Sequence, residues 1–318
     1  MTRRQFLGKL LAVMGLLAIA NRTSLGHGYT ATTPPPYSCN NLSNPEESCK
    51  DTTSALNDPL PPRIPGYKEF LFPDFDNNKW PVFYTGNGPA ILILHEITGL
   101  TPDCVAFGAR LAEAGFTVYL PLLFGSPLQD SFGSGYLQVL SSDLNLYGKT
   151  NQNPLATWLS ALCTQMSREC GNRGIGVIGM CLTGNLVIPL LKNRVVVAPI
   201  MSQPAIPLIT PTVERKRALG VSDQELGDAK QRVKEDNLTI LGFRFTNDCL
   251  SPPERFDRLQ DEFGKHFHPF QIKSPDERFL ITNDAHAVLT KEYRSFPADH
   301  PTRCAFTPVV DFMKSKLL

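Results

Sequence analysis

The sequence has no excess of charge of either sign and, beyond its first residues, no long apolar run. Lys and Arg number 31 and Asp and Glu number 30 in 318 residues, a net charge of +1. This balance gives no electrostatic support for nucleic-acid binding. The absence of further long apolar runs excludes a membrane protein with several spans. Hydrophobic residues make up 42% of the chain, which permits a large core and excludes a mostly disordered protein.

The first 20 residues have the pattern of an export signal. Paired arginines at positions 3 and 4 precede Phe-Leu and an apolar run over residues 10–20. A charged start and a short apolar stretch are typical of a signal peptide, and the arginine pair resembles the twin-arginine type. An ordinary secretory signal and an uncleaved anchor are the alternatives. We predict a signal at 1–20, recognition by the twin-arginine export machinery, a bacterial periplasmic or extracellular location, and no stable membrane span after cleavage.

Residues 21–66 are rich in Pro, Ser, Thr and Asn, a composition that cannot bury enough apolar surface to fold alone. We predict a strap or linker here. The chain has eight cysteines. In an exported protein Cys39 could pair with Cys49, and Cys163 with Cys170, as local disulfide bonds.

From residue 67 onward, apolar β-type runs alternate with helical patterns. The run at 90–94 is apolar throughout, which is typical of a strand buried on both faces. Alternating strands and helices favour parallel crossovers, so we predict one domain over 67–318 with a three-layer α/β architecture and helices on both faces of a mostly parallel sheet. The expected strands are 69–72, 82–85, 90–94, 116–120, 174–178, 194–200, 238–245 and 278–282, and the expected helices are 103–114, 154–166, 182–191, 222–234, 253–263 and 307–316.

A cysteine flanked by glycines joins one of these strands to the next helix. Residues 179–184 read Gly-Met-Cys-Leu-Thr-Gly, which resembles the nucleophile elbow, Gly-x-Ser-x-Gly, with Cys181 in place of serine. Such a turn raises the side chain at the carboxyl edge of the sheet, and a helix N-terminus favours a thiolate. A buried structural cysteine in a tight turn is the alternative interpretation.

An acid and a histidine follow at the ends of later predicted strands, in the order nucleophile, acid, histidine. Asp248 follows the strand ending at Phe245, and His286 follows the predicted strand 278–282. Asp284 is the rival acid. The other histidines, His266, His268 and His300, are expected to be loop or surface residues; a metal pair at the first two is an alternative.

The buried strand 90–94 ends in His95-Glu96-Ile97-Thr98-Gly99. A carboxylate is costly at a desolvated strand end beside a nucleophile, so Glu96 is a candidate functional residue. A glutamate that points outward to solvent is the alternative. His95 is expected to be a packing residue.

Together these motifs resemble the dienelactone hydrolase family. The resemblance covers about residue 67 to the C-terminus and implies the α/β-hydrolase fold. It implies that Cys181 is the nucleophile, His286 the base and Asp248 the residue that orients it. Glu96 matches the glutamate that holds the resting thiol, and the backbone N–H groups of Ile97 and Leu182 would form the oxyanion hole.

One position departs from that family's pattern. The dienelactone-cleaving members carry an arginine one turn after the histidine, where this chain has Thr290. A threonine cannot form the bidentate contact that an arginine makes with a substrate carboxylate. Lys291 or Arg294 could substitute for it.

These residues predict an exported hydrolase of carboxylic esters or lactones that acts through a thioester on a small-molecule substrate. No cofactor and no metal are expected. A non-catalytic binding module on the same fold is one alternative. A thiol-redox protein that uses Cys181 with Cys249 or Cys104 is another, although the chain has no Cys-x-x-Cys pair.

Overall fold

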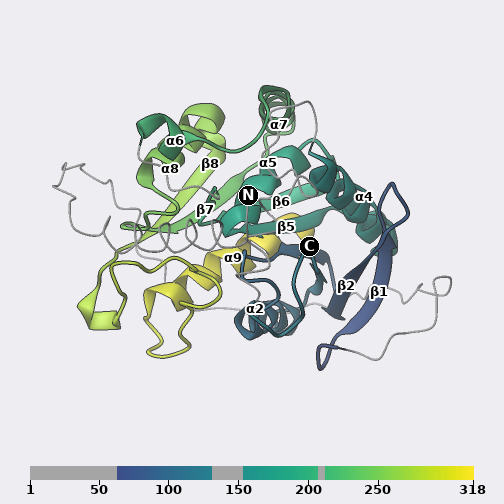
Figure 1. Cartoon of the computed structure of the whole chain (residues 1–318), viewed down its shortest axis with the longest axis horizontal. Coiled ribbons are helices and arrows are strands. Elements are labelled where there is room, and N and C mark those ends of the chain that lie inside the picture. Colours follow the sequence, from purple (N-terminus) through teal and green to yellow (C-terminus); the bar gives the residue numbers. More distant parts are fainter. Residues whose placement is uncertain (1–62, 131–152, 207–211) are drawn as a thin grey trace, which may run out of the picture. The chain divides into compact units, whose positions relative to one another are not determined.

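The computed structural model describes residues 63–130, 153–206 and 212–318, which belong to one compact unit of the chain (Figure 1). The predicted signal at 1–20, most of the predicted strap at 21–66, and the Cys39–Cys49 pair lie outside the described residues. Ile64 is fully buried, so the last residues of the predicted strap are part of the folded domain. No helix in the described ranges has the length and apolar character that crossing a bilayer requires.

The centre of the domain is one eight-stranded sheet with the order β1-β2-β4-β3-β5-β6-β7-β8. The β1–β2 and β2–β4 pairs are antiparallel, and all the other pairs are parallel. The predicted, mostly parallel α/β sheet is therefore confirmed. The strands are β1 (Lys68–Pro73), β2 (Lys79–Gly86), β3 (Ala90–Leu94), β4 (Thr117–Pro121), β5 (Ile175–Met180), β6 (Val196–Ser202), β7 (Ile240–Phe245) and β8 (Phe267–Ile272).

Helices cover both faces of this sheet (Figure 1). Helices α2 and α9 pack on one face, and α4, α5, α7 and α8 belong to the apolar cluster on the other. The α-helices are α2 (Pro102–Glu113), α4 (Pro154–Glu169), α5 (Val187–Leu190), α6 (Val213–Arg217), α7 (Asp223–Glu235), α8 (Pro253–Phe263) and α9 (Pro301–Leu317), and the 3-10 turns are η2 (Cys181–Leu186), η3 (Gly264–His266) and η4 (Glu277–Phe279).

Strand β3 shows why the sheet needs both layers. Its five residues are all fully buried. Because successive side chains of a strand point to opposite faces, Leu92 and Leu94 join the cluster that contains α4, while Ile91 and Ile93 join the cluster that contains α2 and α9. A continuous apolar run is therefore the sequence of a strand that has a helix layer on each side.

Polar caps fix where several helices begin. A capping box is present at α7, where Ser222 accepts from the backbone N–H of Glu225 and the Glu225 carboxylate accepts from that of Ser222. His300 caps α9 and is 3% exposed. The expectation that His300 is a surface residue was therefore wrong, because its ring accepts from the N–H of Thr302 and contacts the carbonyl oxygen of Phe279.

The last strand of the sheet is not the predicted one. Residues 278–282 form no strand: Asp276 accepts from the backbone N–H of Arg278, η4 follows, and Leu280 adopts a left-handed conformation with φ 55°. Strand β8 lies earlier, at Phe267–Ile272, and includes His268. It pairs only with β7 in the described sheet, and a proline is tolerated on such an edge strand. Because β8 contains Pro269 and is largely exposed, its sequence lacks the apolar pattern from which a strand is predicted.

The predicted Cys163–Cys170 disulfide bond is also absent, because Cys163 is a buried free thiol. Burial raises the pKa of Cys163 to about 12, which keeps this thiol protonated at neutral pH.

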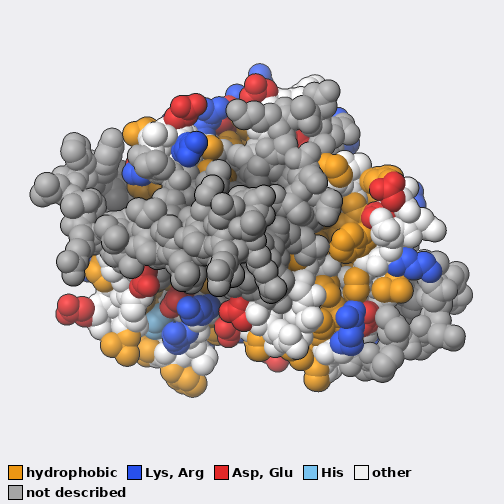
Figure 2. Space-filling model, in the orientation of Figure 1, with side chains coloured by type: hydrophobic (Ala, Val, Ile, Leu, Met, Phe, Trp, Pro, Cys, Tyr) orange, Lys and Arg blue, Asp and Glu red, His pale blue; other side chains and the backbone are white. Residues whose placement is uncertain are grey.

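On the face shown in Figure 2, acidic and basic side chains are interspersed over the described part of the chain, as the near-zero net charge suggests.

Candidate active site

Cys181 lies in a sharp, strained turn between β5 and η2. Its φ is +56°, a left-handed conformation that a residue with a Cβ rarely adopts. Such strain costs about 1–3 kcal/mol and is concentrated at functional sites. Gly179 makes the turn possible, because a Cβ at this position would lie 2.4 Å from the carbonyl oxygen of Thr183. The turn therefore has the backbone geometry of a nucleophile elbow, with Cys181 at its apex.

The second half of this elbow differs from the standard motif. The glycine expected two residues after the nucleophile is replaced by Thr183, and the next glycine is Gly184. The Thr183 hydroxyl accepts from the N–H of Met180 at 3.0 Å and lies 2.9 Å from the carbonyl oxygen of Leu94. A Cβ on Gly184 would lie 2.8 Å from the Cα of Pro204. The elbow is thus tied to the end of β3 on one side and packed against the loop after β6 on the other.

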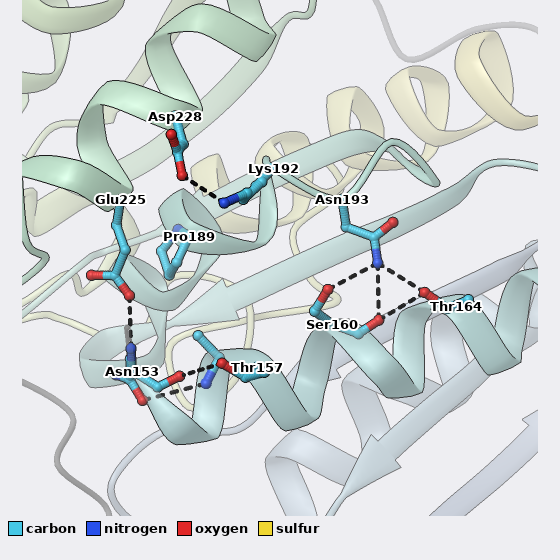
Figure 3. Close-up of a pocket in the computed structure, with 10 residues that line it drawn as sticks. Asn153, Thr157, Ser160, Thr164, Pro189, Lys192, Asn193, Glu225 and Asp228 are labelled. Atoms are coloured by element: carbon cyan, nitrogen blue, oxygen red, sulfur yellow. Dashed lines mark hydrogen bonds and ion pairs between the residues drawn. The ribbon is translucent and has the colours of Figure 1, made fainter. Parts of the chain in front are cut away.

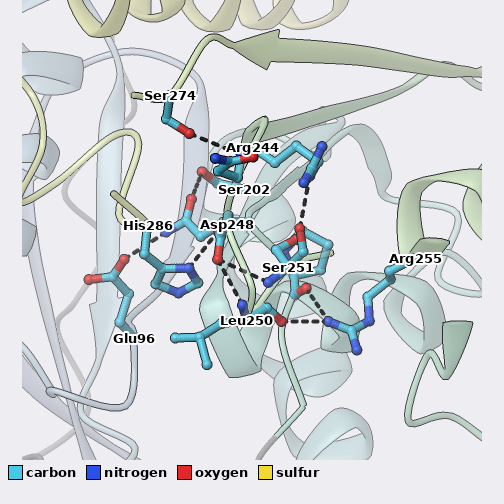
Figure 4. A network of polar contacts seen from close by, with 12 residues as sticks. Glu96, Ser202, Arg244, Asp248, Leu250, Ser251, Arg255, Ser274 and His286 are labelled. Carbon is cyan, nitrogen blue, oxygen red and sulfur yellow. Dashed lines mark hydrogen bonds and ion pairs between the residues drawn. The ribbon is translucent and has the colours of Figure 1, made fainter. Parts of the chain in front are cut away.

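His286 and Asp248 form a close pair, as predicted. The Nδ1 atom of His286 lies 2.7 Å from Oδ2 of Asp248 (Figure 4). The Nε2 atom of His286 is buried and makes no regular hydrogen bond. Cys181 nevertheless lies near enough for its charge to act on the imidazole. Asp248 thus fixes one ring nitrogen, and the Cys181 side chain is the other group that acts on the imidazole.

The negative charge of Asp248 and a positive charge on His286 stabilise each other. Burial alone would lower the pKa of His286, but the negative charges of Asp248 and of a Cys181 thiolate raise it well above its ordinary value. Burial alone would raise the pKa of Asp248, but the imidazolium charge and hydrogen bonds from His286 and two backbone N–H groups lower it. Asp248 therefore remains ionised and stabilises a positive charge on His286.

The loop that carries Asp248 is held by two buried arginines (Figure 4). Oδ1 of Asp248 accepts from the backbone N–H groups of Leu250 and Ser251, at 2.9 Å and 3.1 Å. Arg244 donates to the carbonyl oxygen of Ser251 at 2.8 Å, and Arg255 to that of Leu250 at 2.7 Å. Burial lowers the pKa of Arg244 to about 10, so its guanidinium is still charged at neutral pH. Both arginines are positioning residues that the sequence analysis did not identify.

His286 reaches the site from a loop rather than from a strand. The flanking residues Ala285, Val288 and Leu289 are buried in the cluster that contains α2 and α9. Burial of these neighbours fixes the path of a segment that has no strand hydrogen bonds. The rival acid, Asp284, is exposed, and the imidazole pairs with Asp248 instead.

Glu96 is buried, contrary to the alternative that it points outward. It is 7% exposed. Its Oε1 accepts from the side-chain amide of Gln203 at 2.7 Å, and its Oε2 accepts from the Thr290 hydroxyl at 3.1 Å. Burial raises the pKa of Glu96, an effect that the charge of His286 and these two hydrogen bonds only partly offset. Thr290, which the sequence marked only as a missing arginine, is thus a direct partner of Glu96.

The predicted backbone donors lie in the same region. Leu182 follows Cys181 directly, and Ile97 packs against the apolar cluster that includes both of these residues. The predicted substrate-binding residues are placed differently. Lys291 is exposed, and the Arg294 guanidinium donates to the carbonyl oxygens of Lys291 and Tyr293. Arg294 thus caps its own loop in this structure.

His95 has the packing role expected of it. It is fully buried, its Nδ1 lies 2.8 Å from the carbonyl oxygen of Glu96, and its Nε2 accepts from the N–H of Leu123 at 3.0 Å. Burial lowers the pKa of His95 to about 4. A neutral ring with the proton on Nδ1 satisfies both contacts, so His95 fixes the backbone from which Glu96 and Ile97 project.

The site is mostly enclosed. Cys181 is 5% exposed, and the side chain of His286 is 18% exposed. The imidazole edge therefore provides the contact with solvent.

A separate hollow of about 400 Å³ lies between α4, α5 and α7 (Figure 3). Its polar side chains bond one another, as in the 2.8 Å pair of Lys192 with Asp228, and the candidate catalytic residues do not line it.

A mostly parallel sheet with a nucleophile elbow, followed along the chain by an acid and a histidine at the same edge, defines the class of α/β-hydrolases. Within that class, the chain belongs to the dienelactone hydrolase family, whose sequence profile matches residues 83–278. The resemblance drawn from the motifs is therefore confirmed. No curated protein matches the chain.

Solved structures agree on the fold. A protein described as a dienelactone hydrolase from Klebsiella pneumoniae superposes with a TM-score of 0.55 and 14% identity, over 78% of this chain and 98% of the other. A dienelactone hydrolase-like promiscuous phosphotriesterase from metagenomic libraries gives a TM-score of 0.51 and 13% identity, over 79% and 98%. At this level of identity, these similarities describe the fold alone.

Sequence reasoning missed Gln203, whose side chain reaches Glu96. The available signal was its position, because it directly follows the buried strand β6 at the edge where Cys181 and Glu96 follow their own strands. The two buried arginines gave no such signal, since an arginine in a strand or helix is usually a surface residue.

Proposed function

We propose that the protein is a cysteine-dependent hydrolase of carboxylic esters or lactones in which Cys181 is the nucleophile, His286 the base and Asp248 the residue that orients the imidazole. The single observation that carries the proposal is the position of His286. One ring nitrogen is 2.7 Å from Asp248, the other is buried, and Cys181 is the second side chain that acts on the imidazole. This is the arrangement that a general base needs in order to accept a thiol proton.

The reaction follows from these roles. Nε2 of His286 takes the thiol proton, and the Cys181 sulfur attacks the carbonyl carbon of the substrate. The tetrahedral intermediate collapses to a thioester, and the departing alkoxide receives the proton from His286. Water then attacks the thioester, with His286 as base, and the carboxylic acid and the free thiol are released.

Backbone donors stabilise the oxyanion in each half of the reaction. The N–H groups of Ile97 and Leu182 are proposed for this role, which is often the largest single contribution to catalysis; one donor is worth about 3 kcal/mol. The contact between Thr183 and the carbonyl oxygen of Leu94 supports the assignment, since it joins the two segments that carry these donors.

The test is hydrolysis of a 4-nitrophenyl ester by the wild type and by two cysteine variants. We expect Cys181→Ala to lower kcat/KM by at least 10³-fold without loss of stability. Cys163→Ala, which removes a buried thiol in α4 away from the elbow, is the control and should stay within threefold of the wild type. Acid quenching during turnover should show the acyl mass on Cys181. Full turnover by Cys181→Ala would refute the assignment.

We further propose that the protein is exported in a folded state through the twin-arginine pathway, on the basis of residues 1–20. Fusion of this segment to a reporter that is active only outside the cytoplasm tests the idea, with Lys-Lys in place of the arginine pair as the control. Equal export of both fusions would indicate an ordinary secretory signal.

A further inference from the structure

Gln203 has features that simple packing does not require. It is a fully buried glutamine directly after β6, and its φ of +34° is in the left-handed region. Its backbone N–H donates to the carbonyl oxygen of Phe243 at 2.6 Å, and its side-chain oxygen is a partner of the Ser202 hydroxyl. The amide nitrogen is thereby directed at Glu96, 2.7 Å away.

The same loop is attached to the nucleophile elbow. The N–H of Ala205 donates to the carbonyl oxygen of Cys181 at 2.8 Å, and the Asn185 side chain donates to the carbonyl oxygen of Ala205 at 2.7 Å. Gln203 therefore sits on a segment whose position is set by the elbow itself. Its side chain reaches from this loop to Glu96, which lies just after the end of β3.

Thr290 completes the contact from the opposite side, on the segment that carries His286. Its hydroxyl donates to the second oxygen of Glu96 at 3.1 Å, and the residue as a whole is 3% exposed. Both oxygens of the Glu96 carboxyl group are thus engaged by uncharged donors. We call the three residues Gln203, Glu96 and Thr290 the carboxyl clamp.

The two side chains that donate to Glu96 are uncharged, and Arg110, which approaches the segment that carries Thr290, donates to the carbonyl oxygen of Leu289. The charge of His286 lowers the pKa of Glu96, and the charge of Asp103 raises it. His286 is engaged with Asp248 at 2.7 Å, and Asp103 is a second carboxylate. The guanidinium of Arg244 contacts the Asp248 loop, not Glu96. A carboxylate on a bound acyl group would lose its hydration at this point, and neither donor of the clamp supplies a compensating positive charge.

We propose that Gln203 is a positioning residue for Glu96, and that the carboxyl clamp makes the site select esters or lactones whose acyl part is uncharged. The inference rests on the proposed function and specifies the substrate class of the same site. An uncharged acyl group can lie against a carboxyl group that is held by neutral donors. An anionic acyl group would require a cation that the clamp lacks.

A pair of esters of equal chain length tests the selectivity. Mono-(4-nitrophenyl) glutarate carries a carboxylate where 4-nitrophenyl pentanoate carries a methyl group. For the wild type we expect kcat/KM to be at least tenfold higher for the pentanoate. Thr290→Lys, which places a cation beside Glu96, should reduce this ratio at least threefold, whereas Thr290→Ser should preserve it because the hydroxyl remains.

The ratio of kcat/KM for the pentanoate to kcat/KM for the glutarate also distinguishes a positioning role of Gln203 from a purely structural one. Gln203→Leu should lower kcat for the pentanoate about tenfold and also reduce the selectivity ratio. A variant that is merely less stable would lower both rates equally. If Gln203→Leu does not fold, Thr290→Val provides the same readout from the other donor, and equal losses on both esters would overturn the positioning role.

The outcomes distinguish the two proposals. Cys181-dependent hydrolysis of both esters at equal rates by the wild type would overturn the selectivity and leave the hydrolase intact. Hydrolysis of neither ester would refute the proposed function, and the inference would fail with it.

Discussion

The hydroxyl of Thr183 lies 2.9 Å from the carbonyl oxygen of Leu94 and so joins the turn that carries Cys181 to the strand that precedes Glu96. The residue is 1% exposed. A threonine stands here in place of a motif glycine, and its side chain performs a bridging task that a glycine cannot perform.

Thr183→Val should therefore impair both stability and activity. The substitution keeps the shape but leaves the N–H of Met180 and the carbonyl oxygen of Leu94 without their partner, a loss of about 1–3 kcal/mol. Because the two oxyanion donors would then be less exactly placed, kcat should fall at least tenfold. Urea unfolding and ester hydrolysis measure the two effects. Thr183→Ser keeps the hydroxyl and should behave nearly like the wild type; an equal loss in both variants would contradict the bridging role.

Asp248→Asn should lower kcat/KM by about 10³-fold or more with little structural change. If the asparagine oxygen keeps the bonds from Leu250 and Ser251, its amide nitrogen faces Nδ1 of His286. The ring must then carry its proton on Nε2 and cannot accept the thiol proton. The matched control is Asp284→Asn, which changes an exposed carboxylate near His286 and should leave kcat/KM within threefold. The reverse pattern would assign the acid to Asp284.

The stability of the fold should fall as the pH drops from about 6.5 to about 4, in part because of His95. Its pKa is lowered from 6.5 to about 4 by burial. The unfolded chain therefore binds a proton in this window that the folded chain does not, which destabilises the fold by on the order of 3 kcal/mol at the acidic end. Urea unfolding at pH 7 and pH 4 should show a smaller difference for His95→Asn than for the wild type. His268→Asn, on the edge strand, should keep the wild-type difference.

Gly179→Ala should destabilise the fold by about 3 kcal/mol or more, because the added Cβ would lie 2.4 Å from a backbone oxygen of the elbow. Gly227→Ala is the matched control. It lies in α7 with no atom within 4 Å of the added methyl group, and alanine should stabilise that helix by about 0.5–1 kcal/mol. Equal effects of the two substitutions on the free energy of unfolding would show that the elbow tolerates a side chain.

Much of the sheet could be predicted because its strands are buried on both faces. The run at 90–94 and the helix at 253–263 match their observed bounds. The edge strand β8 was missed because its exposed face and Pro269 remove the apolar pattern that marks an internal strand. The predicted helix at 182–191 is divided into η2 and α5, since the chain must first complete the turn around Cys181.

The candidate triad was predictable for a related reason. Parallel strands bring their carboxyl ends to one edge, so residues just after Leu94, Met180 and Phe245 lie along the same edge of the sheet whatever their separation along the chain. His286 lies beside Asp248 although the predicted strand before it is absent, because buried apolar neighbours, and not a strand, fix its loop.

The sequence alone determined the layered architecture, the cysteine elbow and the family, because burial pattern and short motifs are local properties of the chain. Only the tertiary structure decided that Glu96 faces inward, that Gln203 and Thr290 are its partners, and that Arg244 and Arg255 hold the acid loop. Those contacts join segments from distant parts of the chain through hydrogen bonds in a buried region, and a hydrogen-bond partner depends on where the fold places both groups.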